Sequence, residues 1–152
     1  MFVLGPSLTV EYRTIVVPVV RTAESEEALV AAARLATERR ARIVIVSVVE
    51  APLELPFDAR LPAQEQAANQ ALDDAQAMVE TYGVNAVTRL VRARRAGPAI
   101  VKEAADRNAE LIVIGAPRRG GRQGAPIFGG TVDYVLRHAP SRVLVTAGSK
   151  AA

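Results

Sequence analysis

The chain has 152 residues, of which 50% are hydrophobic and 4% aromatic, so one domain with a core of Val, Ile, Leu and Ala is expected. The chain has no cysteine, which excludes disulfides and thiolate chemistry. It has one histidine, which leaves few ligands for a zinc site and little basis for a Ser-His pair. The net charge is +3, but residues 1–76 carry seven basic and eleven acidic side chains and residues 77–152 carry twelve and five, which argues for an anionic ligand near the C-terminal half, where Arg89, Arg92, Arg94 and Arg95 lie.

The hydrophobic pattern alternates between strand and helix along the whole chain. In chain order it predicts a leader at 1–12, strand 13–20, a helix from Thr22 to the basic residues 39–42, strand 43–49, helix 63–82, strand 86–92, helix 97–108, strand 111–114, helix 130–138, strand 142–146 and a tail at 148–152. Pro18 should end the first strand, and the connection 50–62 holds three prolines and predicts irregular structure.

This alternation predicts an α/β fold in residues 13–147, with a doubly wound parallel sheet and two helices on each face. The strand order is expected to be 3-2-1-4-5. Ligands of such sheets bind at the carboxyl ends of strands where the winding reverses. That point lies between the first and fourth strands, so Val19 and Val20 should face the segment that begins at Gly115.

The segment 115–131, GAPRRGGRQGAPIFGGT, is glycine-rich and connects the fourth strand to the last helix. Glycines let main-chain N–H groups turn inward, and the helix N-terminus adds a partial positive charge. The guanidinium groups of Arg118, Arg119 and Arg122 could donate paired hydrogen bonds to phosphate oxygens. The alternative is a surface loop whose arginines only keep it solvated; the position at the switch point favours a phosphate site.

Several segments resemble the universal stress proteins, a family of small dimeric doubly wound domains of which one branch binds ATP and another does not. The resemblance spans residues 12–147. It rests on IVVPV at 15–19, SEEAL at 25–29, AELIVIG at 109–115 and VLRHAPSRVLV at 135–145.

The family's nucleotide signature is Gly, two residues, Gly, nine residues, Gly, then Ser or Thr. Gly120, Gly130 and Thr131 match its second part, whereas Pro117 stands where the first glycine is expected. ATP-binding members usually carry an acidic residue shortly after the first strand, and this chain has Val20 there. Losing one hydrogen bond to a charged group weakens binding by roughly ten- to a hundredfold.

The resemblance implies a site for ATP or another adenine nucleotide, with Mg²⁺ as a companion ion of the phosphates. Main-chain groups of Gly120 and Gly130 and the Thr131 hydroxyl would bind phosphate, and Arg118 and Arg119 would neutralise its charge. Val19, Val20 and Val48 would pack against the base. The predicted nucleotide-binding residues are Pro18, Val19, Val20, Val48, Gly115, Arg118, Arg119, Gly120, Gly130, Thr131 and Val132.

Three functions stay open. The first is a non-catalytic nucleotide sensor in stress response, and the second is a nucleotide-blind interaction module, such as a partner of a membrane transporter. The third, a slow ATP hydrolase, would depend on Asp133, the only acid near the loop. His138 is interpreted as structural, because it lies at a helix C-terminus before Pro140.

The resemblance also implies a homodimer in which the last strand pairs with its partner's copy. Val143, Leu144 and Val145 would otherwise form an exposed apolar edge. No stretch reaches the roughly 18 to 20 apolar residues of a membrane span and no signal pattern is present, so a soluble, cytoplasmic protein is expected. Few aromatic residues and no reading motif make nucleic acid an unfavoured partner.

Overall fold

A computed structural model describes residues 11–20, 23–116 and 129–147. Within them strands and helices alternate, and no helix there is both long and apolar enough to pass through a membrane. The elements are β1 (Thr14–Pro18), α1 (Ala23–Arg39), β2 (Arg42–Glu50), α2 (Pro62–Glu80), β3 (Ala86–Ala93), α3 (Ala96–Asp106), β4 (Leu111–Ala116), α4 (Gly130–His138) and β5 (Arg142–Ala147).

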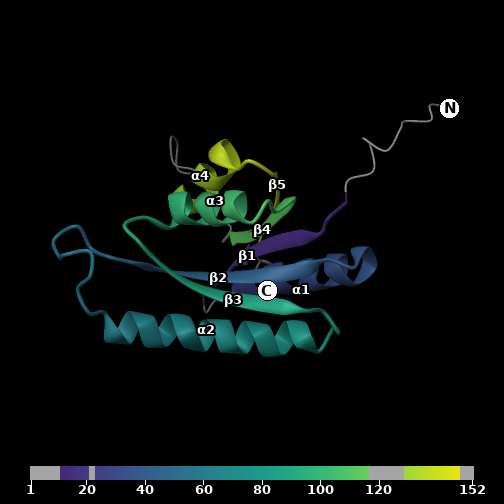
Figure 1. Cartoon of the computed structure of the whole chain (residues 1–152), viewed down its shortest axis with the longest axis horizontal. Coiled ribbons are helices and arrows are strands. Elements are labelled where there is room, and N and C mark those ends of the chain that lie inside the picture. Colours follow the sequence, from purple (N-terminus) through teal and green to yellow (C-terminus); the bar gives the residue numbers. More distant parts are fainter. Residues whose placement is uncertain (1–10, 21–22, 117–128, 148–152) are drawn as a thin grey trace, which may run out of the picture.

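The five strands form one parallel sheet in the order β3-β2-β1-β4-β5 (Figure 1). β1 lies at the centre, with Ile15 opposite Ile43 of β2 on one side and Leu111 of β4 on the other. The winding therefore reverses between β1 and β4. The predicted α/β class and strand order are confirmed.

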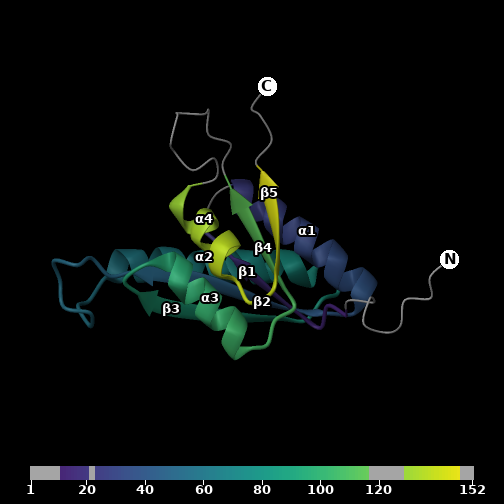
Figure 2. The same cartoon turned by 90° about the horizontal axis from the view of Figure 1, so that it is seen from above.

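Helices cover both faces of the sheet (Figure 2). Alternate residues of a strand point to opposite faces, so Ile15 and Val17 join the core under α1 and α2, whereas Val16 joins the core under α3 and α4. All three side chains are fully buried. Two apolar layers therefore hold the central strands, and each layer has two helices as predicted.

The boundaries differ from the sequence predictions by a few residues. β1 ends at Pro18, as expected from the proline, and not at residue 20; beyond it the Val20 N–H donates to Ser25 Oγ of α1 at 3.0 Å. β4 continues to Ala116 because Gly115 and Ala116 lie opposite residues of β5. α3 ends at Asp106, since Asn108 adopts a left-handed conformation with φ of 50°.

Arginines of β3 and its C-terminal flank hold the connection between β2 and α2, which projects beyond the sheet in Figure 1. Arg92 donates to the carbonyls of Phe57 and Ala59, at 3.3 and 2.7 Å, and pairs with Glu65. Arg94 donates to three carbonyls of the same connection and lies 5.5 Å from the Phe57 ring. Charged donors satisfy main-chain oxygens that have no strand partner.

This arrangement corrects one sequence interpretation. The basic cluster of β3 was expected to attract an anion, but Arg92 and Arg94 bind main-chain carbonyls and Arg89 pairs with Glu103 of α3 at 3.2 Å. Arg95 stands over the Tyr134 ring of α4 at 6.0 Å. Within the described residues, two of these four arginines, Arg89 and Arg92, therefore have a carboxylate partner in the fold.

Candidate functional site

A cavity of about 300 Å³ lies at the carboxyl ends of β1, β2 and β4, against the N-termini of α3 and α4. This is the switch point of the sheet, where ligands of doubly wound folds bind. The lining residues are Pro18, Val19, Val20, Ser25, Val46, Val48, Glu50, Ala96, Ile100, Ile114, Gly115, Gly129, Gly130, Thr131 and Val132.

The lining is mainly apolar along one side. Val46 and Ile100 are buried, and Val48 packs against the core under α3 and α4. Val20 is 59% exposed at the rim. Small-molecule sites are typically apolar clefts with a few convergent polar groups, and this wall fits an aromatic or other apolar ring.

The N-terminus of α4 supplies polar groups on another side of the cavity. The first N–H groups of a helix have no helical carbonyl to bind, and no side chain caps this end within the described residues. Gly129 precedes the helix with φ of 88°, a conformation that favours glycine. Gly130, Thr131 and Val132 of this first turn all line the cavity, and a helix N-terminus suits an anion.

Gly115 lies where β4 meets the first turn of α1. An added Cβ would stand 2.2 Å from the Glu24 carbonyl oxygen, far inside van der Waals contact. The glycine was predicted for phosphate binding; the structure gives it a packing role as well, because only a residue without a side chain lets α1 approach β4.

The described members of the predicted nucleotide site all line this one cavity. Val19 is only 3% exposed and belongs mainly to the core under α1 and α2. Arg118, Arg119 and Gly120, together with Pro117 and Arg122, lie outside the described residues. The predicted residues brought together are Pro18, Val19, Val20, Val48, Gly115, Gly130, Thr131 and Val132.

Sequence reasoning missed some of the lining. Val46 and Glu50 lie on the same face of β2 as Val48, and Ala96 and Ile100 are four residues apart on α3. The two-residue period of strands and the helical spacing of α3 could have identified them. Ser25, Ile114 and Gly129 complete the set.

A family model for the universal stress proteins matches residues 11–147. The chain belongs to the universal stress protein family. Among curated proteins no sequence match is found.

Solved universal stress proteins share the fold. One from Archaeoglobus fulgidus is 24% identical with a TM-score of 0.72, covering 88% of this chain and 98% of its own. A family member from Burkholderia pseudomallei is 28% identical with a TM-score of 0.68, covering 90% and 96%. One from Lactobacillus plantarum is 24% identical with a TM-score of 0.67, covering 90% and 98%.

The two groups considered for catalysis in this universal stress protein domain do not line the cavity. Asp133 pairs with Arg137 one turn later at 3.1 Å. His138 lies against the Tyr134 ring, with centroids 4.2 Å apart. Both contacts lie within α4, which agrees with structural roles. In the described ranges, no three His, Cys, Asp or Glu side chains group so as to hold a metal ion.

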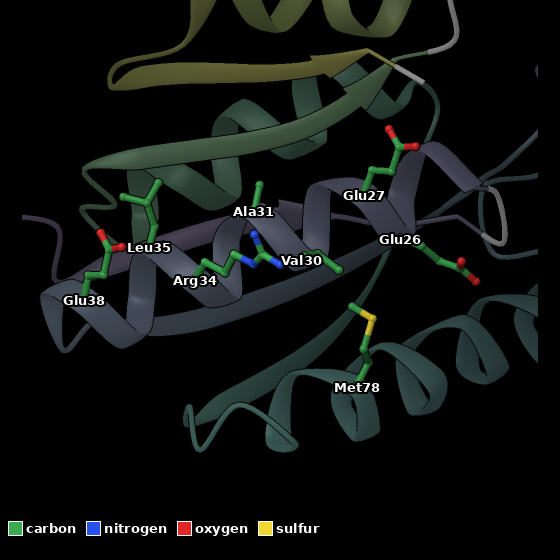
Figure 3. A pocket seen from close by; sticks show the side chains of 8 residues that line it. All are labelled: Glu26, Glu27, Val30, Ala31, Arg34, Leu35, Glu38 and Met78. Carbon is green, nitrogen blue, oxygen red and sulfur yellow. The ribbon is translucent and has the colours of Figure 1, made fainter. Parts of the chain in front are cut away.

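A second hollow, of about 620 Å³, runs along the outer side of α1 (Figure 3). Glu26, Glu27 and Glu38 line it with Arg34, and Met78 points toward it from α2. Three carboxylates against one guanidinium oppose an anion. Despite its larger volume, this hollow is lined by no glycine and carries an acidic excess, so the cavity at the switch point is the better candidate.

Proposed function

We propose that this universal stress protein domain binds an adenine nucleotide without turning it over and acts as a homodimer. The observation that carries the proposal is a cavity at the switch point that has an apolar wall and also includes the N-terminus of α4, which no side chain caps within the described residues. A nucleotide has the matching parts, since its base is flat and apolar on its faces and its phosphates are anionic.

Structural neighbours of this chain support the choice of nucleotide through the shared fold. A universal stress protein in complex with cAMP is 20% identical with a TM-score of 0.72, and the match covers 92% of this chain and 100% of that one. A universal stress protein from Archaeoglobus fulgidus in complex with dAMP is 22% identical with a TM-score of 0.69, and the match covers 90% and 98% of the two chains. A family protein from Arabidopsis thaliana with AMP bound is 12% identical with a TM-score of 0.65, and the match covers 91% and 93%.

In the proposed complex, phosphate oxygens accept hydrogen bonds from the first N–H groups of α4 and from the Thr131 hydroxyl. The base lies against Val20 and Val48, which line the cavity from β1 and β2. Any Mg²⁺ would be held largely by the phosphates, as is usual for this ion. Asp133 is engaged by Arg137 and does not line the cavity, so we expect binding without hydrolysis.

Calorimetric titration with ATP, ADP, AMP and cAMP tests the proposal. We expect at least one of them to bind with a dissociation constant in the micromolar range, because Val20 leaves the nucleoside end without the family's acidic contact. Overnight incubation with ATP and Mg²⁺ should release no phosphate above the buffer control. Millimolar or absent binding by all four would instead favour a nucleotide-blind interaction module; association with a membrane transporter stays a prediction of that alternative.

The proposed dimer uses β5, an edge strand of the sheet. Val143 and Val145 pack against the core under α3 and α4, while Leu144 is 38% exposed. Uncovered apolar edges tend to pair with another chain. Of the three residues of the predicted interface, Val143 and Val145 therefore face the core and Leu144 faces outward.

Leu144→Glu is expected to convert the dimer to a monomer at low micromolar concentration, because pairing would bring a carboxylate from each copy into an apolar contact. Sedimentation velocity measures the change. Val87→Glu is the matched control, since it adds the same charge to an exposed position on the opposite edge strand, β3. A wild-type chain that sediments as a monomer, or a Leu144→Glu variant that remains dimeric, contradicts pairing through β5.

A further inference from the structure

Glu50 is the only charged side chain that lines the cavity among the described residues. It is the last residue of β2, and the alternation of the strand places it on the same face as Val46 and Val48. Its carboxylate is exposed at the rim. The cavity is therefore polarised, with a negative group at the end of β2 and the N-terminus of α4 elsewhere on its lining.

Within the described residues the Glu50 carboxylate forms no hydrogen bond or ion pair, although the residue itself belongs to the β2–β3 ladder. Its register partner on β3 is Ala93, which is flanked by Arg92 and Arg94. Both arginines bind the connection that follows β2 instead, and Arg92 takes Glu65 as its carboxylate partner. Arg92 extends from the face of β3 opposite to the one that carries Ala93 and Glu50, and both arginines are engaged elsewhere, so the Glu50 carboxylate keeps its full acceptor capacity.

We infer that Glu50 accepts a hydrogen bond from a donor at the nucleoside end of the bound nucleotide, either a ribose hydroxyl or an exocyclic amine of the base. The inference rests on the proposed nucleotide site. A carboxylate is a strong acceptor for such donors, and it repels phosphates, so it also orients the ligand with its phosphates toward α4. β2 would then supply the acidic contact for which Val20 on β1 has no group.

The test compares ATP affinity by calorimetry in wild type, Glu50→Ala and Glu50→Gln. The alanine variant should bind ATP about tenfold to a hundredfold more weakly, the usual effect of losing a charged hydrogen bond. The glutamine variant keeps one acceptor oxygen and should fall between them. Inorganic triphosphate has no nucleoside, so its affinity for both variants should be at least as high as its affinity for the wild-type protein.

Glu54→Ala is the matched control, because Glu54 is an exposed carboxylate on the connection that follows β2 and does not line the cavity. The ATP affinity of this variant should equal that of wild type. Glu50→Ala binding ATP within about twofold of wild type, or Glu54→Ala weakening it equally, overturns the inference while the nucleotide site stands. A wild-type chain that binds no nucleotide overturns both.

Two analogues separate the possible donors. If the donor is a ribose hydroxyl, wild type prefers ATP over 2′,3′-dideoxy-ATP, which lacks both ribose hydroxyls, and Glu50→Ala loses that preference. If the donor is the exocyclic amine, wild type prefers ATP over purine riboside triphosphate, which lacks the amine, and Glu50→Ala loses that preference. Either result supports the inference, and a Glu50→Ala variant that retains the wild-type preference in both comparisons overturns it.

Discussion

Gly115→Ala is expected to destabilise the domain by about 3 kcal/mol, at the upper end of the usual cost of overpacking. The added Cβ would stand 2.2 Å from the carbonyl oxygen of Glu24 and 2.6 Å from its carbonyl carbon. Both atoms belong to the main chain, so no side chain can rotate away. Relief requires the first turn of α1 to move off β4. Thermal unfolding followed by circular dichroism should show a midpoint lowered by roughly 6 to 12 °C.

Gly130→Ala is the matched control, since an added Cβ there meets nothing within 4 Å and the residue begins a helix. Alanine favours helix over glycine, so this variant should unfold at the same temperature as wild type or slightly higher. A Gly115→Ala protein as stable as Gly130→Ala would mean that α1 and β4 do not approach as closely as described.

The order of the sheet could be predicted from the sequence because the pattern of apolar residues is unambiguous. Short β-branched runs such as 43–49 alternate with segments of helical spacing, and right-handed crossovers then leave few topologies. Strand ends were less predictable. Gly115 and Ala116 belong to β4 because β5 pairs with them, and a long-range partner of this kind leaves no local signal.

The glycines and valines that line the site could be predicted from the sequence, but the roles of its charged residues could not. Arg92 and Arg94 were expected to serve an anion, yet they bind carbonyls of the connection 51–61. Glu50 was missed, although the period of β2 places it beside Val48. Whether a charge serves a ligand or the fold depends on partners tens of residues away, and composition does not reveal them.

Gly115 illustrates how one residue type serves two demands. A glycine at the end of β4 was interpreted as part of a phosphate cradle, and it does line the cavity. The same position admits no side chain because of the Glu24 carbonyl. A loss of nucleotide binding in a Gly115 variant would therefore mix folding with recognition, and the phosphate position needs a test that separates the two.

Thr131→Asp provides that separation. Thr131 is an exposed residue in the first turn of α4 and lines the cavity. An acidic side chain in the first turn stabilises a helix by about 0.3 to 1 kcal/mol, so the unfolding temperature should be unchanged or slightly raised. The same carboxylate would lie within a few ångströms of the proposed phosphates. At about 5 Å and an effective dielectric constant of about 20, each pair of like charges costs roughly 3 kcal/mol; with screening at this exposed position, ATP affinity should fall at least about a hundredfold.

Thr131→Ser is the matched control, because it keeps the hydroxyl and should bind ATP within about threefold of wild type. Calorimetry and thermal unfolding on the same samples give both readouts. The expected pattern, in which the aspartate variant is folded and binds far more weakly, assigns the loss to repulsion at the helix N-terminus. An aspartate variant that binds ATP like wild type would place the phosphates away from α4, because a nucleotide bound there could not tolerate the added charge.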